Sequence, residues 1–446
     1  MKYTPHTEKD IEGMLSALGF ASIDELIEAA VGKSALARHS LSIGKAISED
    51  ELVRQLQDIA SLNITVEDFT SFLGAGAYDH FIPAALDAII SRPEFYSAYT
   101  PYQPEVSQGT LTAIFEYQSL VSSLVGLDVC NASMYDGASA LAEAVHLAVR
   151  KTHRRKVIIP RSLHPLWDKT VRTYIGGIAD FVVVDFDSTG RMHNPASLVD
   201  DKTACVVVAS PNFFGVIENI ALLELAVHSS GALLISVFNP ISLGLLKPPG
   251  ELGADIAVGE GQPLGIPLGF GGPYLGIFAA RREFIRSMPG RIVAETVDAD
   301  GKRGFVMTLQ TREQHIRRAR ATSNICTNEG LAALAATVFM TLMGKTGMKK
   351  LAELNIQKAH YLAERLTSLE GVSLRFSAPF FNEFAISLPA SASSVIERLK
   401  DKGFIAGFDL GRFYPGEDNS LLIAVTERRT KDEMDDFAES MKEVIS

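Results

Sequence analysis

The stretch Ala254–Ala279, ADIAVGEGQPLGIPLGFGGPYLGIFA, decides how the rest of the chain is interpreted. A short apolar strand, predicted over Ile256–Val258, leads into a loop with six glycines, and a second apolar strand follows at Gly276–Ala279. Glycine allows the backbone to adopt positive φ angles and to approach a ligand or another chain closely. Two strands joined by such a loop are typical of an active-site floor. From Gly253 to Gly276, however, the sequence contains no Lys, His, Ser, Thr or Cys, so this floor has no nucleophile.

Composition excludes several classes of protein. The 446 residues allow about two to three domains, and the net charge of −11 does not favour nucleic acid or a membrane surface as a partner. Three well-separated cysteines, Cys130, Cys205 and Cys326, indicate a reducing compartment without a disulfide framework. The polar start has no signal-peptide core, and the longest apolar run, 231–246, is shorter than a membrane-spanning helix. We expect a cytoplasmic protein with no bound metal, because no His/Cys cluster has metal-ligand spacing.

The pattern of predicted helices and strands changes twice along the chain, which predicts three regions. Residues 1–65 contain short amphipathic helices with capping-box starts, and we expect them to form an N-terminal arm over the main domain or a partner. Residues 66–345 alternate apolar strands with helices and form the predicted large domain. Residues 346–446 are predicted to form a small C-terminal α/β domain.

The large domain is predicted to contain a parallel sheet covered by helices on both faces. Short apolar strands separated by helices are typical of such sheets, and ligands bind beyond the carboxyl ends of their strands. The predicted strands are Val157–Pro160, Phe181–Asp185, Cys205–Ala209, Leu233–Val237, Ile256–Val258 and Gly276–Ala279. The predicted helices are Leu111–Val125, Ala138–Lys151, Pro165–Tyr174, Glu218–Ser229 and Asn328–Met343.

A segment rich in tyrosine and proline precedes the predicted sheet. Residues 96–108 hold three tyrosines, two prolines and two glutamines, and the prolines favour an extended path. Such a path can carry rigid polar side chains into a site, and a surface connector that only packs its tyrosines is an equally good interpretation. Gly74 and Gly76 do not indicate a dinucleotide site, because no strand precedes them and the third glycine is missing.

Five motifs resemble those of the glycine cleavage system P-protein family. They are TPYQPEVSQGTLTAIFEYQ (Thr100–Gln118), NASMYDGASALAEA (Asn131–Ala144), ASPNFFGVIEN (Ala209–Asn219), GFGGPYLG (Gly269–Gly276) and RATSNICTNEGL (Arg320–Leu331). The resemblance runs through nearly the whole chain and implies the α/β fold of fold-type I pyridoxal-phosphate (PLP) enzymes, the aspartate-aminotransferase-like plan. The length matches the form of the family that is split into two subunits, and the chain is similar to its first, or alpha, subunit.

Two departures from the family pattern remove the charged groups that would hold the cofactor. Aligned by IPLGFGGP, the Schiff-base lysine position falls at or near Gln262, and aligned by GALLISV, the position of the aspartate for the pyridine nitrogen falls at Val237. Lys247 and Lys302 are poor substitutes, since their surroundings predict exposed side chains. His164 stands where a cofactor-stacking histidine could lie, and we expect a structural role for it.

The resemblance therefore implies a subunit that works in trans. The expected partners are a PLP-bearing beta subunit in an α2β2 assembly and a lipoylated H-protein, and glycine is the expected substrate. Together the subunits would decarboxylate glycine and pass the aminomethyl group to the lipoyl arm, whereas this chain alone would be inactive. The residues expected to complete the partner's site are Tyr99, Thr100, Tyr102, Gln103, Glu105 and Gln108, with Thr322, Ser323 and Asn324 as possible phosphate contacts.

Two alternatives stay open from the sequence. One is an independent fold-type I enzyme, such as an aminotransferase or a lyase, with its lysine placed elsewhere. The other is a non-catalytic scaffold that only stabilises the beta subunit. An activity measurement on interface variants would separate the scaffold from a subunit that contributes to the site.

Overall fold

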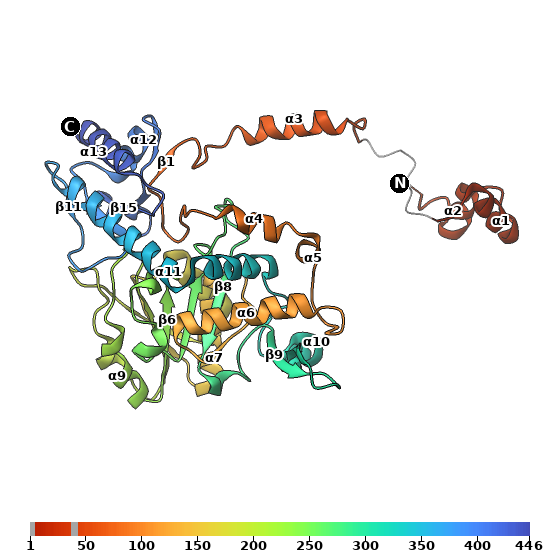
Figure 1. The fold of residues 1–446 in the computed structure, drawn as a ribbon, viewed down its shortest axis with the longest axis horizontal. Coiled ribbons are helices and arrows are strands. Elements are labelled where there is room, and N and C mark those ends of the chain that lie inside the picture. The colour runs from red at the N-terminus through yellow and green to blue at the C-terminus, as the bar shows by residue number, and fades with distance from the viewer. Residues whose placement is uncertain (1–4, 37–42) are drawn as a thin grey trace. The chain divides into compact units, whose positions relative to one another are not determined.

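The computed structural model describes residues 5–36 and 43–446, which divide into two compact units, Met1–Ile64 and Thr65–Ser446. The first unit consists of three short helices, α1 (Glu8–Leu18), α2 (Ile23–Val31) and α3 (Glu49–Ala60) (Figure 1). Side chains of Thr7, Ser22 and Ser48 cap these helices, as the sequence predicts. Nowhere in these three helices is a residue buried, so their apolar side chains have no core of their own.

A seven-stranded sheet forms the centre of the second unit. Its order is β2 (Val129–Cys130), β8 (Gly276–Ala280), β7 (Ile256–Glu260), β6 (Leu233–Phe238), β5 (Thr203–Ala209), β3 (Lys156–Pro160) and β4 (Asp180–Val184). The strands from β7 to β4 are parallel, whereas β8 runs antiparallel to β7. The prediction that the last strand is parallel is therefore wrong. The glycine-rich loop before β8 contains no helix, and without a crossover helix the chain returns antiparallel.

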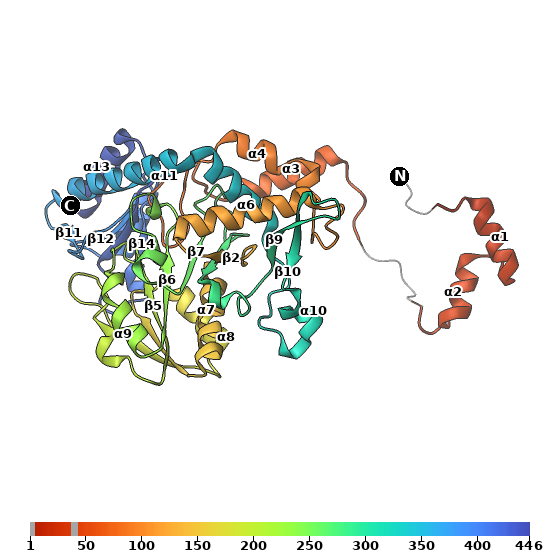
Figure 2. The ribbon, with the colours of Figure 1, turned by 60° about the horizontal axis from the view of Figure 1, so that its bottom comes forward.

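Alternate residues of the strands face two different helical layers. Ile256 and Val258 of β7 pack in one core with α7 (Gly137–Thr152) and α8 (Pro165–Ile175). Ala257, between them, packs on the opposite face with α6 (Gln108–Val125) and α11 (Gly330–Thr367). Helices α6 and α11 lie side by side on that face (Figure 2). This two-sided burial explains why the strands appear in the sequence as short, continuous apolar runs.

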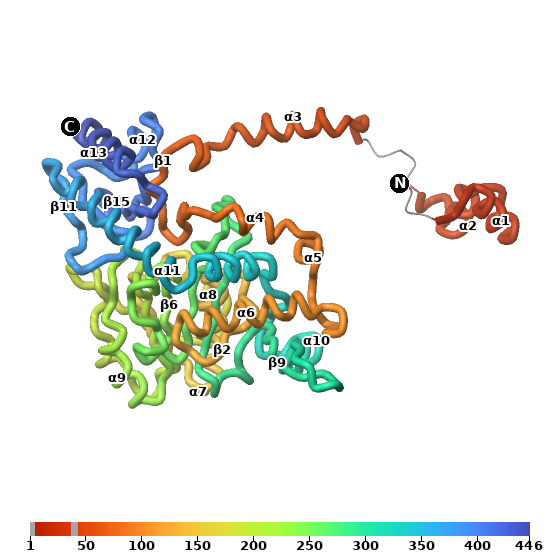
Figure 3. The backbone as a smooth tube through the Cα atoms, viewed as in Figure 1, coloured from red at the N-terminus to blue at the C-terminus, as the bar shows by residue number. Residues whose placement is uncertain are grey.

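Helix α11 joins the large sheet to the C-terminal part of the chain (Figure 3). Gly344, with φ 57° and ψ −176°, interrupts it just before the boundary predicted at 345/346. Although α11 is long and apolar enough to cross a membrane by length and composition, it packs against α6 as a core helix does. The sheet that follows has the order β11 (Ser373–Leu374), β12 (Glu383–Ser387), β15 (Ser420–Ala424), β14 (Phe408–Asp409), and α12 (Ala392–Lys400) and α13 (Lys431–Ile445) cover it.

Other boundaries differ from the sequence prediction. The helix predicted over Glu218–Ser229 is only α9 (Glu224–Ser229) after a short 3-10 turn, and the one predicted over Asn328–Met343 begins at Gly330 and continues past Gly344. An antiparallel hairpin, β9 (Ile292–Val297) and β10 (Arg303–Thr308), was not predicted. The remaining short elements are β1 (Thr70–Ser71), β13 (Phe404–Ile405), α4 (Ala84–Ile90), α5 (Pro93–Tyr96) and α10 (Gln314–Arg317).

Candidate functional site

A cavity of about 80 Å³ lies beyond the carboxyl ends of β5, β6 and β7. Ligand pockets commonly measure about 300–1,000 Å³, so this one is small. Its lining includes five aromatic rings, those of Tyr78, His164, Trp167, Phe213 and Phe238. It also includes two carboxylates, Glu260 at the end of β7 and Glu383 at the start of β12. The cavity therefore lies where open α/β sheets bind ligands, beyond the carboxyl ends of their parallel strands.

The two positions singled out in the sequence are both close to this cavity. Val237, the last but one residue of β6, lines it directly. Gln262 follows β7 and is 1% exposed. Its Oε1 accepts a hydrogen bond from Tyr78 N (2.9 Å), and its Nε2 donates to Tyr78 O (2.9 Å) and to Ile266 O (2.8 Å). The Gln262 side chain thus holds the polypeptide itself.

The segment Gly74–Phe81 contributes two residues, Gly76 and Tyr78, to the lining of the cavity. Tyr78 donates its hydroxyl hydrogen to Glu383 (2.9 Å), and Ala75 N donates to the other oxygen of the same carboxylate (2.7 Å). Gly76 has φ 109°, and a Cβ added there would lie 3.0 Å from His164 Nε2. Only glycine fits this position, because the backbone conformation and the close ring both exclude a side chain.

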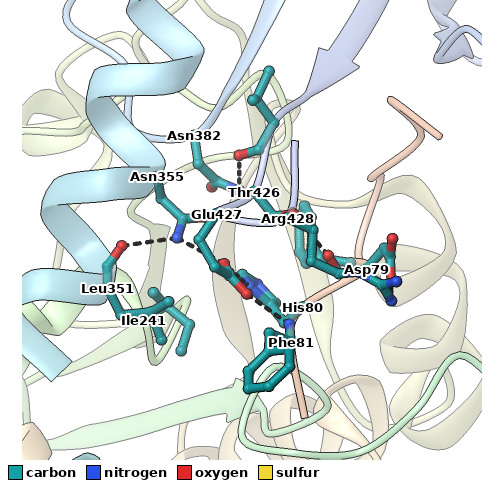
Figure 4. A network of polar contacts seen from close by, with 12 residues as sticks. Asp79, His80, Phe81, Ile241, Leu351, Asn355, Asn382, Thr426, Glu427 and Arg428 are labelled. Atoms are coloured by element: carbon teal, nitrogen blue, oxygen red, sulfur yellow. Dashed lines mark hydrogen bonds and ion pairs between the residues drawn. The ribbon is translucent and has the colours of Figure 1, made fainter. Parts of the chain in front are cut away.

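The same segment is fixed to the C-terminal part on its other side (Figure 4). His80 Nδ1 donates to Glu427 (2.8 Å), whose second oxygen accepts from Phe81 N (2.6 Å). Arg428 pairs with Asp79 at 2.7 Å. Burial raises the pKa of Glu427, but the hydrogen bonds from His80 and from the backbone outweigh it and lower that pKa to about 2. Glu427 is therefore ionised at neutral pH and serves as an anchor for the segment.

His164 has both ring nitrogens occupied by the protein. Its Nδ1 accepts from Leu166 N (3.1 Å) at the start of α8, so its proton is on Nε2, which donates to Ala75 O (2.8 Å). Burial lowers the pKa of His164, which favours this neutral form. The ring caps a helix and holds the Gly74–Phe81 segment, the structural role expected from the sequence.

The electrostatics of the cavity do not fit PLP. Burial raises the pKa of both Glu260 and Glu383 to about 7. Glu260 accepts from three backbone N–H groups, those of Gly137, Gln262 and Leu275, which occupy both of its oxygens. Among the described residues, no lysine or arginine lines the cavity. A phosphate dianion would meet carboxylates without a compensating cation, and the aldehyde would find no amine.

The Tyr99–Gln108 segment lies on a different part of the surface, between α5 and α6. Its members Tyr99, Tyr102, Gln103 and Glu105 are exposed, and Thr100 is half-buried with a hydroxyl that has no partner among the described residues. Gln108 differs, because its Nε2 donates to Pro104 O and Phe305 O while its Oε1 accepts from Phe305 N. Its amide ties α6 to β10, so Gln108 is a structural residue of this chain.

The loop Thr322–Asn324 is only partly available to a ligand. Ser323 is buried and accepts from Ile325 N (3.1 Å), and the Thr322 hydroxyl lies 3.4 Å from Arg312 O, whereas Asn324 is exposed. The structure does bring this loop close to the tyrosine-rich segment. Tyr102 shares the lining of a shallow cavity of about 380 Å³ with Ile325 and Cys326, and Tyr99 shares another with Thr327 and Asn328.

Three residues at these sites were missed by the sequence analysis. Tyr78 and Glu383 line the first cavity, and Arg291 lies 3.4 Å from the hydroxyl of Tyr102, which lines the cavity shared with Ile325 and Cys326. The sequence signal for Glu383 is an acidic residue inside the otherwise apolar run FFNEFAISL. Arg291 is likewise a charged residue at the start of an apolar strand, and it is 4% exposed. Charges in such positions are rare unless they are paired, so each pointed to a specific contact.

Comparisons with known proteins agree with this architecture. The family model for the glycine cleavage system P-protein matches residues 1–441. Two curated relatives, from Desulfitobacterium hafniense and Prosthecochloris aestuarii, are named "Probable glycine dehydrogenase (decarboxylating) subunit 1". They are 49% and 50% identical to this chain, over 100% and 99% of both sequences, respectively.

Solved structures show the same relationship. A crystal structure of glycine decarboxylase (P-protein) of the glycine cleavage system, in inhibitor-bound form, matches with a TM-score of 0.91 and 41% identity over 100% of both chains. Lactobacillus brevis glutamate decarboxylase matches with a TM-score of 0.71 at 15% identity, over 94% of this chain and 97% of its own. The second match shows the fold alone and confirms the expected fold-type I architecture.

Proposed function

Because this chain belongs to the glycine cleavage system P-protein family, we propose that it is the non-cofactor subunit of a two-subunit glycine dehydrogenase (decarboxylating). The observation that carries this assignment is the cavity beyond β7. Gln262, at or near the position where the family resemblance places the lysine, holds Tyr78, and two buried carboxylates face a space with no cation among its described lining residues. A homologous partner subunit would therefore hold the PLP, which when bound delocalises the negative charge left after carbon dioxide departs.

This chain's own contribution is to complete the partner's site. The side chains of Tyr102 and Gln103 are exposed, and Pro101 and Pro104 restrict the backbone that carries them. A hydroxyl and an amide held on a stiff segment can bind the carboxylate of glycine with little ordering cost. Asn324, the exposed residue of the neighbouring loop, can donate its amide hydrogens to the cofactor's phosphate.

The helices of the first unit support tight association with such a partner. Each has apolar side chains that are exposed within the unit, and obligate interfaces commonly bury more than about 2,000 Å². The exposed apolar residues of these helices are Met14, Leu18, Ile23, Ile27, Val31, Leu52, Val53, Leu56 and Ile59. We infer an obligate assembly, α2β2 in the simplest case, which would act in the cytoplasm on glycine and on a lipoylated H-protein.

An exchange experiment tests the assignment directly. The chain alone, the lysine-bearing partner alone and the co-expressed pair are each assayed for glycine–bicarbonate exchange in the presence of H-protein. We expect exchange only from the pair, which should elute as one species in sizing chromatography at micromolar concentration. Exchange by this chain alone would support an independent enzyme, and full exchange by the partner alone would leave only a scaffold role.

A further inference from the structure

Arg291 connects the two surface segments that are candidates for the shared site. It immediately precedes β9 and is 4% exposed. Its Nη2 donates to Cys326 O (2.7 Å) and its Nη1 to Thr327 Oγ1 (2.9 Å), just after the Thr322–Asn324 loop. On its other side the guanidinium lies over the ring of Tyr102, 5.6 Å from the ring centroid, and Nη2 is 3.4 Å from the Tyr102 hydroxyl. One buried cation therefore contacts the tyrosine-rich segment and the residues that directly follow the Thr322–Asn324 loop.

The acidic neighbour of Arg291 does not account for its placement. Glu313 is also buried, but the closest approach of the two charged groups is 3.8 Å, from Nε to Oε2. Within the described part of the chain, Arg291 Nε and Glu313 Oε1 have no hydrogen-bond partner. The guanidinium donates its short hydrogen bonds to Cys326 and Thr327 and lies over the ring of Tyr102. Glu313 mainly supplies a compensating charge, without which burying an arginine would be costly.

We propose that Arg291 is a positioning residue, which holds Tyr102 and the residues after Asn324 in a fixed relation to each other. This inference rests on the proposed function, because it concerns the site that the chain completes in trans. Tyr102 is 52% exposed and its hydroxyl has Arg291 as its one hydrogen-bond partner in the described residues, so it needs an anchor to be held in one orientation. A guanidinium suits the task, since its planar fork can donate to two acceptors while its face stacks on a ring.

The first test measures local order in the isolated chain and does not depend on activity. In Arg291→Lys the point charge remains, but the fork and the flat face are lost. We expect amide hydrogen exchange to become several-fold faster both in the Tyr99–Gln108 segment and in residues 322–328. Unchanged exchange in either segment would overturn the inference, because a residue that links two segments must protect both.

Arg429→Lys is the matched control. Arg429 is also 4% exposed, pairs with a buried acid (Asp79, 3.0 Å) and has an unpaired Nε among the described residues. Its contacts are with the Gly74–Phe81 segment and α13, so faster exchange should appear there and not in the tyrosine-rich segment. Faster exchange at Tyr99–Gln108 in both variants would mean general destabilisation and would overturn the positioning role.

The second test is a double-mutant cycle in the assembled pair. A misplacement of about 1 Å can cost about 10²-fold in rate, so Arg291→Lys should lower kcat for exchange by about 10- to 100-fold. In a Tyr102→Leu background the same change should cost much less, because the residue that it positions is gone. Equal losses in both backgrounds, or a change in H-protein KM with kcat intact, would overturn the inference. A wild-type pair without exchange would refute the proposed function, while hydrogen exchange would still decide the role of Arg291.

Discussion

Replacing Gln262 with lysine should weaken the fold and should not create a cofactor site. The wild-type amide accepts from Tyr78 N and donates to Tyr78 O and Ile266 O. A lysine can still donate to the two carbonyls, but it cannot accept, so the Tyr78 N–H loses its partner in a buried place. Leaving a buried donor unsatisfied costs about 1–3 kcal/mol. Burying the new ammonium adds a desolvation cost, so we expect the free energy of unfolding to fall by at least that amount.

The introduced lysine would also lack the other half of the required chemistry. Val237 offers no carboxylate to keep a pyridine nitrogen protonated, and the cavity, about 80 Å³, is small. PLP added to the variant should therefore form no stoichiometric adduct at the introduced lysine, and the variant without its partner should not decarboxylate glycine.

Two measurements and one control decide this prediction. Trp167 is the only tryptophan and lines the cavity, so its fluorescence during urea unfolding reports on stability at this place. Borohydride reduction and peptide mass spectrometry report on an adduct. Gln262→Met, of similar length, removes all three hydrogen bonds without adding a charge and should destabilise to a similar or greater extent. Unchanged stability in both variants would refute the argument about Tyr78, and a full adduct with glycine decarboxylation would refute the argument about the cavity.

Three further predictions follow from the same structure. In the assembled pair, Tyr102→Phe or Gln103→Ala should lower the exchange rate by about tenfold or more through lost positioning, with partner PLP content and complex size unchanged; activity that falls only with assembly would favour a scaffold. PLP added to the wild-type chain alone should neither quench Trp167 nor leave a borohydride-reducible adduct on one lysine. Because Glu383 has a pKa of about 7 when folded against 4.5 ordinarily, the folded state binds its proton more tightly, and the free energy of unfolding should fall by about 3 kcal/mol as pH rises from 4.5 to 7. Glu383→Gln should remove that part of the slope in urea titrations at several pH values, and an unaltered slope would place the titration elsewhere.

The sequence predicted the features that depend on local patterns. Continuous apolar runs predict the strands of the main sheet. Motif alignment predicts that the lysine and aspartate positions of the family fall at or near Gln262 and at Val237. Strand direction could not be predicted in the same way. The run that forms β8 is as apolar as its parallel neighbours, and only the missing crossover helix distinguishes it.

The site residues that were not predicted form contacts with residues far away in the sequence. Glu383 forms hydrogen bonds with Ala75 and Tyr78, which lie roughly 300 residues earlier in the sequence. The spacing of apolar residues predicts helices and strands, but it does not predict a contact between residues so far apart. The same holds for Arg291 and Tyr102, which the fold brings together from separate elements. Gln108 was named as a site candidate because it belongs to the polar, extended segment, and its bonds to Phe305 could not be foreseen because the β9–β10 hairpin was itself not predicted.

The Gly74–Phe81 segment also has a consequence for motion. On one side it is bonded to groups of the large domain, Gln262 after β7 and His164 at the start of α8, and on the other to Glu383 and Glu427 of the C-terminal part. A hinge rotation between these two parts would have to break at least one of these sets of bonds, most of which are buried or half-buried and costly to leave unmade. We therefore expect this subunit to change its shape little during turnover. In the proposed assembly, any opening and closing that admits substrate would then take place in the partner subunit, against a rigid surface of this chain.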